Sequence, residues 1–495
     1  MSRNMSVERL AGTAALLAAY LPVAWAGGIA AGPLTTASGP SPFAGCTADA
    51  GQSGFSYAGS EVEPWVAVDP ADGNNIVGAW QQDRWSNGGS RGLVAGYSGD
   101  GGATWQSAVI PGLTKCSGGE YERASDPWVT FAPNGDVYHI AITFNDANNT
   151  NAVLVNKSTD GGRTWSPPIT LIRDTAPSPF NDKETITADP HDARYVYAIW
   201  DRLLVPPAER ARGRAPERAV GYRGPTWFSR TTDGGATWEP ARAIYDPGTV
   251  NQTIGNQIVV LPNGDLVNVF NLIASFKNAH KIRGMNVAVL RSSDRGEHWS
   301  GPVLIDKLLS VGVTDPESGE PVRTGDIIPE IAVDPNSGYL YVIWQDARFS
   351  GVDQIAFSMS VDGGLNWSPT LRLGNAPVGV QAFTPTARVR ADGTVAVGYY
   401  DFRNNDDGAD LKADYYVTHC HPTTPATCAD PAGWSDAIRV TSTSFDMRQA
   451  PFALGYFVGD YAGLGTDGTD FLAFFAQPAG GDPASVFFRR LGGVP

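Results

Sequence analysis

Histidine and cysteine are scarce in this chain, with 6 and 4 residues respectively among 495, and the histidines do not cluster. Neither a Cys-x-x-Cys pair nor a Cys/His spacing typical of zinc sites occurs, so we expect no such metal centre. A Gly-x-Ser-x-Gly elbow and a phosphate-binding glycine loop are also missing. Their absence leaves a serine-hydrolase triad or a nucleotide site without support.

Positive charge is also in short supply. The chain has 36 Lys and Arg against 51 Asp and Glu, which gives a formal net charge of −15. Apart from one loop there is no basic block, so we expect no nucleic-acid partner. After the first 25 residues no apolar run is long enough to span a bilayer, so we expect no membrane span.

The N-terminus has the pattern of a secretory signal. Arg3 and Arg9 precede an apolar run, Leu10 to Trp25, which ends in the small-residue sequence Ala24-Trp25-Ala26. This pattern predicts a signal peptide over residues 1–26, cleaved after Ala26, and a secreted protein. An uncleaved membrane anchor is the alternative, which the short apolar run disfavours.

Export makes the four cysteines candidates for two disulfides. Cys420 and Cys428 are eight residues apart in one predicted loop, so we expect them to pair, which leaves Cys46 for Cys116. Residues 27–54 are rich in Gly, Ala, Ser and Pro. We therefore predict a linker there, tethered by the second disulfide.

One eight-residue phrase, Ser/Thr-x-Asp-Gly-Gly-x-Thr-Trp with small variations, occurs five times. Its aspartates are Asp100, Asp160, Asp233, Asp294 and Asp362. The carboxylate can accept bonds from its own turn, and the glycines supply positive φ. The Trp that follows can pack between neighbouring sheets. Repetition of one such unit, built from short strands, predicts an all-β protein with the propeller architecture.

This phrase resembles the Asp box of sialidases and related secreted propellers. The resemblance is one of architecture, because Asp boxes are structural turns, and it covers residues 60 to 490. It implies a sialidase-like Asp-box β-propeller over residues 55–495.

Counting the strand pairs that precede each box predicts seven units, with six, the number in sialidases, as the alternative. The last unit shows no fourth strand of its own. We expect the segment between Gly54 and Ser60 to supply it, since in closed propellers the other terminus commonly does so.

Residues just before the first strand and just after the second strand of each unit should ring one mouth of the propeller channel. Carboxylates and arginines recur at these positions. The candidate carboxylates are Glu63, Asp126, Asp182, Glu184, Asp326, Glu330 and Asp460, and the candidate arginines are Arg84, Arg202, Arg348 and Arg403.

Such a mouth suits sugar chemistry, because glycoside cleavage needs a carboxylic acid and a carboxylate or its equivalent. Crowded carboxylates raise one another's pKa, and arginines can hold a substrate carboxylate. Sialidases use an arginine cluster, a Tyr/Glu nucleophile pair and an Asp acid. The resemblance implies the four arginines as binding groups and the carboxylates as catalysts, with Tyr461 or Tyr400 in the tyrosine role.

Two observations weigh against direct transfer of the sialidase mechanism. The repeated Asp-Arg pairs can equally be ion pairs that stitch the units together, so the non-repeating residues 181–184, 325–330 and 459–461 carry more functional weight. In addition, sialidases carry an Arg-Ile-Pro phrase before the first box, where this chain has Glu61-Val-Glu-Pro-Trp65.

Two loops carry smaller signals. The insertion Leu203 to Trp227 contains five arginines and could cover the mouth, with a solvated loop as the alternative. We expect no cofactor. Asp406, Asp407 and Asp410 form an acidic turn that offers a minor structural Ca²⁺ site.

Together these features favour a secreted, monomeric glycoside hydrolase that acts on extracellular, acidic carbohydrate. A non-catalytic propeller that binds a glycan or a protein is the alternative from another class. A polysaccharide lyase is the third possibility.

Overall fold

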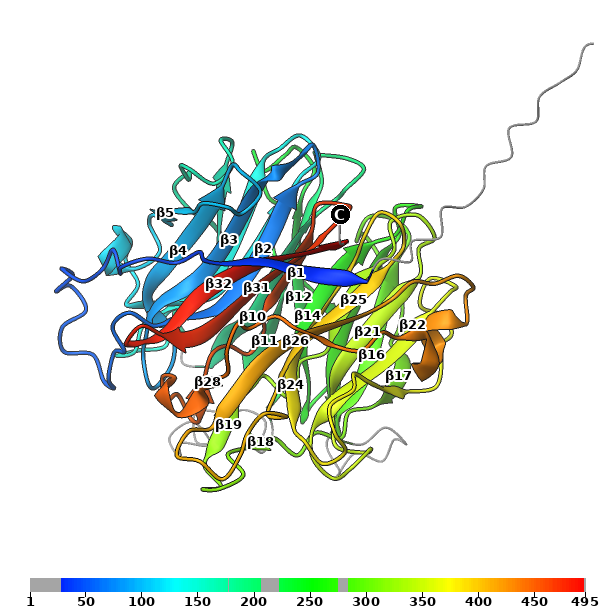
Figure 1. Ribbon diagram of the computed structural model, residues 1–495. Coiled ribbons are helices and arrows are strands. Elements are labelled where there is room, and N and C mark those ends of the chain that lie inside the picture. The colour runs from blue at the N-terminus through cyan, green and yellow to red at the C-terminus, as the bar shows by residue number, and fades with distance from the viewer. Residues whose placement is uncertain (1–27, 177, 206–221, 275–283, 494–495) are drawn as a thin grey trace, which may run out of the picture.

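The apolar runs and turns of the sequence fold into short antiparallel strands. The computed structural model describes residues 28–176, 178–205, 222–274 and 284–493, and these form an all-β protein (Figure 1). The expected signal peptide, residues 1–26, lies outside the described residues, as does the central part of the basic insertion, residues 206–221. Among the described residues, no helix has the length and apolar character needed to cross a membrane.

Most strands belong to four-stranded antiparallel units that follow one another along the chain. The first two units are β2 (Glu61–Asp69), β3 (Asp72–Arg84), β4 (Ser90–Ser98) and β5 (Gln106–Val109), then β6 (Arg123–Phe131), β7 (Val137–Phe144), β8 (Asn151–Ser158) and β9 (Ile169–Asp174). The pairing of Ser90 with Ala124 joins these two units into one eight-stranded sheet. The next two are β10 (Pro179–Ala188), β11 (Val196–Leu204), β12 (Thr226–Thr231) and β13 (Arg242–Tyr245), then β14 (Asn251–Val260), β15 (Leu266–Ala274), β16 (Asn286–Ser292) and β17 (Val303–Lys307).

Two further units follow, with a small extra sheet beside them. They are β20 (Glu330–Val333), β21 (Leu340–Asp346), β22 (Gln354–Ser360) and β23 (Leu371–Leu373), then β24 (Ala382–Val389), β25 (Val395–Asp401), β26 (Lys412–Cys420) and β27 (Ile438–Arg439), with β28 (Phe445–Asp446) also on β26. The extra sheet joins β18 (Val313–Thr314), β19 (Pro321–Arg323) and β29 (Tyr456–Phe457). Short 3-10 helices are η1 (Lys115–Ser117), η3 (Thr427–Ala429), η4 (Pro431–Gly433) and η5 (Met447–Gln449).

The last unit takes its outer strand from the N-terminal part of the chain. It consists of β30 (Gly463–Thr466), β31 (Phe471–Ala479), β32 (Asp482–Gly493) and β1 (Ile29–Thr36). In Figure 1 the blue β1 lies along the red β32, and the two pair antiparallel, with Leu34 opposite Arg489. This corrects two predictions. Residues 54–60 do not supply the strand, and part of the expected linker 27–54 is a sheet strand, because its Ala, Leu and Thr side chains suit an outer edge.

The first and last units also pack against each other. Val66 and Trp80 of the first unit share a buried cluster with Phe474, Val486 and Phe488 of the last. Trp105, which follows the first Asp-Gly-Gly turn, lies with its ring centroid 5.4 Å from that of Phe474. Apolar side chains from the two ends of the chain therefore form one core.

Each Asp-Gly-Gly turn is held by the carboxylate of its own aspartate. At Asp100, Oδ1 accepts bonds from Ser98 Oγ at 2.8 Å and from the Thr104 backbone N–H at 2.9 Å, while Oδ2 accepts from Thr104 Oγ1 at 2.6 Å. The same contacts recur at Asp160 and Asp233. These bonds hold the pKa of Asp100 at about 2, so its carboxylate is ionised at neutral pH.

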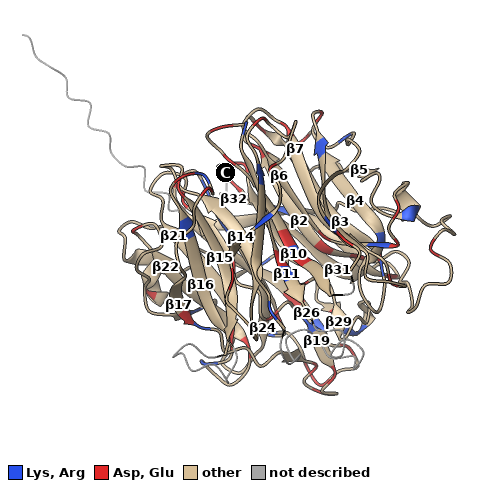
Figure 2. Ribbon diagram, turned by 180° about the vertical axis from the view of Figure 1, so that it is seen from behind, with Lys and Arg blue, Asp and Glu red and all other residues tan. Residues whose placement is uncertain are grey.

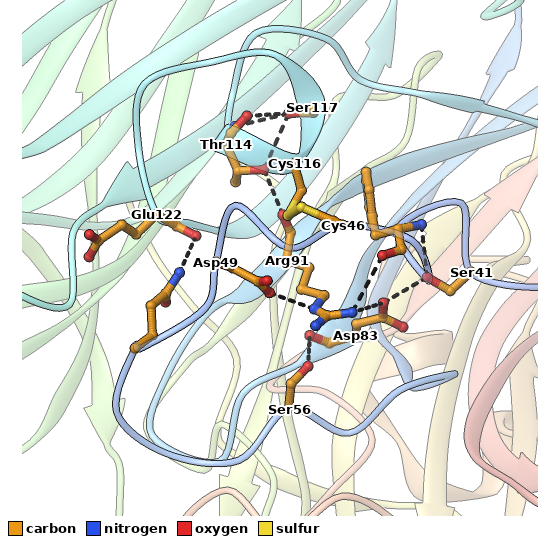
Figure 3. Close-up of a disulfide and its surroundings, with 12 residues drawn as sticks. Ser41, Cys46, Asp49, Ser56, Asp83, Arg91, Thr114, Cys116, Ser117 and Glu122 are labelled. Carbon is orange, nitrogen blue, oxygen red and sulfur yellow. Dashed lines mark hydrogen bonds and ion pairs between the residues drawn. A yellow bond between two sulfur atoms is a disulfide. The ribbon is translucent and has the colours of Figure 1, made fainter.

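Both disulfides that the sequence predicts are present, Cys46–Cys116 and Cys420–Cys428. The first ties the segment after β1 to the loop after β5. Figure 3 shows Arg91 beside it, with its Nε 2.6 Å from Asp49 Oδ2. Two disulfides fit an oxidising, extracellular environment.

Candidate functional site

We call the first strand of each unit its inner strand. Five inner strands carry a bulge at the same place. Pairing between the first and second strands is interrupted there in β2, β6, β10, β14 and β24. One residue in each bulge has a positive φ. These residues are Glu63 (54°), Asp126 (53°), Lys183 (50°), Gly255 (71°) and Thr384 (49°).

Proline explains three of the five bulges. Pro64, Pro127 and Pro385 follow the residue with positive φ, and proline has no N–H to donate to the ladder. A side chain with left-handed backbone geometry costs about 1–2 kcal/mol. A bulge also re-aims the side chain that it carries. The backbone strain at Glu63 and Lys183 therefore accompanies a geometry that brings their charged side chains together.

Lys183 lies at the centre of these groups. Its Nζ is 2.8 Å from Asp126 Oδ1, 2.7 Å from Asp460 Oδ2 and 3.3 Å from Glu63 Oε1. The three carboxyl groups come from β6, from the loop before β30 and from β2. Figure 2 shows acidic and basic ribbon segments close together around β10 and β2.

Arg323 completes this arrangement from outside the units. Its Nε donates to Asp460 Oδ1 at 3.0 Å and its Nη2 to Asp460 Oδ2 at 2.5 Å, which makes a bidentate ion pair. β19 carries Arg323 and pairs parallel with β29, where the Phe457 ring lies 4.6 Å from the guanidinium carbon. We call Glu63, Asp126, Lys183, Arg323 and Asp460 the Lys183 cluster.

The pKa values within the cluster are pushed apart. Burial raises the pKa of Glu63 to about 8, although Lys183 acts in the opposite direction. Burial also opposes ionisation of Asp460, but Arg323 and Lys183 outweigh it and hold its pKa well below the usual range. At neutral pH the cluster thus contains a neutral carboxylic acid and an ionised carboxylate that contact the same lysine.

Solvent reaches the cations of the cluster before the carboxyl groups. The exposed fraction of the side chain is 28% for Arg323 and 11% for Lys183, but 4% for Asp460 and Asp126 and 1% for Glu63. Lys183 and Asp460 also line a cavity of about 30 Å³, together with Glu184, Tyr461 and others. A cavity of that size holds one or two waters and no sugar. A ligand from solvent therefore meets Arg323 and Lys183 first.

The remaining predicted carboxylates lie around the cluster without joining it. Asp182 neighbours Lys183, and burial raises its pKa. Asp326 Oδ2 accepts a bond from Ser310 Oγ at 2.6 Å. Glu330 Oε1 accepts bonds from Thr386 Oγ1 at 2.9 Å and from the Ala387 N–H at 3.1 Å. Neither Asp326 nor Glu330 contacts Lys183.

Glu184 lines the cavity in an unusual state. The residue is 1% exposed, and neither carboxyl oxygen has a hydrogen-bond partner of normal geometry among the described residues. Burial raises its pKa well above the usual range, so the carboxyl group is neutral. A water in the cavity would give it a partner.

The two tyrosines differ in position. Tyr461 lines the cavity, and its hydroxyl donates to the Pro127 carbonyl at 3.0 Å. Tyr400 is a wrong prediction for this mouth: it is 1% exposed, and its hydroxyl donates to the Ala476 carbonyl at 2.7 Å. The alternation of β25 turns that ring into the core between two units.

The predicted convergence of four arginines is also wrong. Arg202 Nη2 pairs with Asp174 at 2.6 Å, Arg348 Nε with Asp346 at 2.9 Å and Arg403 Nη2 with Asp401 at 2.6 Å. Arg202 reaches Asp174 of the preceding unit, and Arg348 also reaches Asp306 of the preceding unit, whereas Arg403 and Asp401 belong to one unit. Ion pairs that join units are what the alternative interpretation of the repeated Asp-Arg pattern predicts. Arg84 alone of the four lies at the cluster, and its guanidinium carbon is 4.8 Å from the Phe457 ring, on which Arg323 also lies.

Sequence reasoning missed Lys183 and Arg323. Lys183 had a signal, since it stands between acidic residues in the non-repeating stretch 181–184. Arg323 had none, because it lies in the connection between two units, where no repeat aligns it. The acidic turn forms a local ion pair, in which Asp406 Oδ2 lies 2.5 Å from Lys412 Nζ. Calcium binding at Asp406, Asp407 and Asp410 stays a prediction.

No family model and no curated protein matches the sequence. Three solved structures with a similar fold are the α-L-arabinofuranosidase of Fusarium graminearum (12% identity, TM-score 0.44, 87% of this chain and 92% of that one), the α-L-arabinanase of Penicillium chrysogenum (12%, 0.44, 93% and 98%) and a Hadza microbial sialidase (16%, 0.42, 88% and 66%). Likenesses at this level carry no argument about activity, which has to come from the site.

Proposed function

We propose that the protein is a secreted, sialidase-like Asp-box propeller that hydrolyses glycosidic bonds in extracellular acidic glycans at the Lys183 cluster. The arrangement that carries the proposal is the contact of Glu63 and Asp460 with the same lysine, where burial raises the pKa of Glu63 and the cations outweigh burial to lower that of Asp460. Environments that push the pKa values of neighbouring carboxyl groups apart define an acid and a base.

In this proposal the seven four-stranded units are the blades of a closed propeller. Support comes from the pairing of β1 with β32 and from the buried cluster that the first and last units share. Six blades, as in sialidases, would leave one of the four-stranded units without a place in the ring.

The proposed roles follow from charge and reach. Glu63 protonates the leaving oxygen, and Asp460 stabilises or attacks the sugar carbon. Glu63 Oε1 and Asp460 Oδ2 are 3.3 and 2.7 Å from the same Nζ, so they lie within about 6 Å of each other. Retaining glycosidases separate their carboxyl groups by about 5–5.5 Å and inverting ones by more, so we propose retention.

The cations select the substrate. Arg323 and Lys183 are the cluster's most accessible side chains, and both suit a sugar carboxylate. A substrate carboxylate that takes these cations frees Glu63 and Asp460 from Lys183. Tyr461 plays no nucleophilic part in this proposal, because burial raises its pKa and its hydroxyl already donates to Pro127.

The test is to incubate the purified protein with acidic glycans and with their neutral counterparts, and to follow products by proton NMR and ultraviolet absorbance. We expect release of a sugar from the acidic glycans only, with retention at the anomeric carbon. An unsaturated, ultraviolet-absorbing product would replace hydrolysis by lyase chemistry. Saturable binding without product would favour a binding propeller, which the low exposure of Glu63 also suits.

A further inference from the structure

A second cavity lies between the inner strands, towards their C-terminal ends; no residue of the Lys183 cluster lines it, although Trp128 and Gln257 line both cavities. Its volume is about 200 Å³, less than that of a typical drug-sized site, so it suits a small ligand. Five inner strands and Arg388 of β24 line it. The lining residues are Trp65, Ala67, Trp128, Val129, Thr130, Ile186, Thr187, Ala188, Pro190, Gln257, Ile258, Val259, Val260, Ile331, Ala332, Val333 and Arg388.

Arg388 is the one charged residue in that lining, and it has no ion pair among the described residues. Its Nε donates to the Leu464 carbonyl at 2.9 Å, which leaves Nη1 and Nη2 without a protein acceptor in the described parts of the chain. The residue is half-buried, and its guanidinium carbon lies 6.0 Å from the Trp65 ring. A cation in such surroundings normally has a counter-charge.

The neighbouring carboxyl group does not supply this counter-charge. Burial raises the pKa of Glu330 to about 8, so it is neutral at pH 7, and its Oε1 already accepts bonds from Thr386 and Ala387. Glu330 lines the smaller cavity and is not part of the Arg388 cavity. Glu330 interacts with Arg388 electrostatically, but no carboxylate among the described residues pairs with the guanidinium.

Other polar groups in the cavity can donate to the same ligand. Gln257 Oε1 accepts a bond from the Ile331 N–H at 3.1 Å, while its Nε2 has no partner among the described residues. Thr130 Oγ1 accepts from the Ala188 N–H at 3.2 Å, and its hydroxyl hydrogen is free to donate. The rest of the lining is largely apolar, which strengthens electrostatic attraction at the site.

We infer that the Arg388 cavity is a binding site for a small monovalent anion, held by the Arg388 guanidinium with Gln257 Nε2 and the Thr130 hydroxyl. The ligand class follows from the donors, since every free polar group described there donates and none carries negative charge. The site is separate from the Lys183 cluster and does not depend on hydrolase activity.

Acetate and its neutral analogue acetamide test the inference by tryptophan fluorescence, because Trp65 and Trp128 line the cavity. Acetate should give a saturable change in the wild-type protein, and acetamide should give none. Arg388→Gln should weaken acetate binding at least tenfold. The matched control is Arg390→Gln, two residues further along, whose Nη2 pairs with Asp392 at 2.8 Å and which should bind acetate like the wild type.

Equal acetate binding by Arg388→Gln and the wild type, or equal responses to acetate and acetamide, would overturn the inference. Bromide soaked into crystals of the wild-type protein gives a test that does not require the variant to fold. An anomalous peak beside the Arg388 guanidinium is the expected result. A cavity without bromide, with peaks elsewhere on the protein, would contradict the site.

Discussion

A single cation, Lys183, holds together carboxyl groups that come from three different units. Its three contacts, at 2.7 to 3.3 Å, join residues 57 to 277 positions away along the chain. Without the lysine, Glu63, Asp126 and Asp460 would face one another with only the arginines to offset their charge. The lysine thus stabilises the fold and sets the charge of the site at once.

We predict that Lys183→Met lowers the free energy of unfolding by about 3–5 kcal/mol at pH 8, because it leaves buried carboxylates without their partner. The loss should be smaller at pH 5, where protonation relieves the repulsion. Urea unfolding at the two pH values measures both. Lys412→Met, which breaks an exposed pair with Asp406, is the control and should cost about 0.5 kcal/mol or less.

Glu330 makes stability depend on pH. Burial raises its pKa to about 8 in the folded protein, against the ordinary glutamate value of 4.5. Its contribution to stability is therefore complete below pH 4.5 and is lost as the pH rises towards 8. We predict that Glu330→Gln reduces this loss by an amount on the order of 4 kcal/mol. Thermal melts at pH 5 and pH 8 measure it; parallel declines for variant and wild type would refute the assignment.

Strands were predictable from the sequence because their signals are local. The run from Pro64 to Pro70 predicts β2, and Tyr339 to Trp344 predicts most of β21. The positive φ at Glu63 and Lys183 was not predictable, because glycine, the usual signal, is absent there. The contacts between residues of different bulges were not predictable either, because they form between strands that are far apart in the sequence.

Gly255 tests the packing of one bulge. It has φ 71°, and a Cβ there would lie 2.8 Å from Ile328 Cγ2. We predict that Gly255→Ala costs about 2–3 kcal/mol, from backbone strain and overpacking together. Gly264→Ala is the control, because it shares a positive φ of 87° but has open space around the new methyl group. Equal losses in chemical denaturation would rule out the contact term.

The small sheet of β18, β19 and β29 lies outside the repeated units and positions one residue of the site, Arg323. It joins the segment before β20 to the segment before β30 and delivers Arg323 to Asp460. Sequence reasoning placed Asp460 just before the first strand of its unit, and the structure has it there, before β30. It missed the arginine partner, because the partner lies in a connection.

At the scale of the whole molecule, two devices fasten the N-terminal segment. β1 forms the outer edge of the last sheet, and Cys46–Cys116 bridges 70 residues, whereas Cys420–Cys428 bridges 8. In the chain-entropy model, loops of these sizes give about 4 and about 2.5 kcal/mol of stability.

We therefore predict that replacing Cys46 and Cys116 by serine lowers stability more than replacing Cys420 and Cys428 does. Equilibrium unfolding of the two double variants gives the comparison. A greater loss from the shorter loop would show that local packing, and not chain closure, sets the contribution.

The central claim is that the Lys183 cluster, and not the repeated Asp-Arg pairs, is the functional site. The most direct measurement is turnover of an acidic glycan by Asp460→Asn and by Asp401→Asn, each of which removes the carboxylate of one Asp-Arg pair. We predict at least about a 100-fold loss of kcat for Asp460→Asn and near wild-type turnover for Asp401→Asn. Equal activity in both variants, with both folded, would contradict the account.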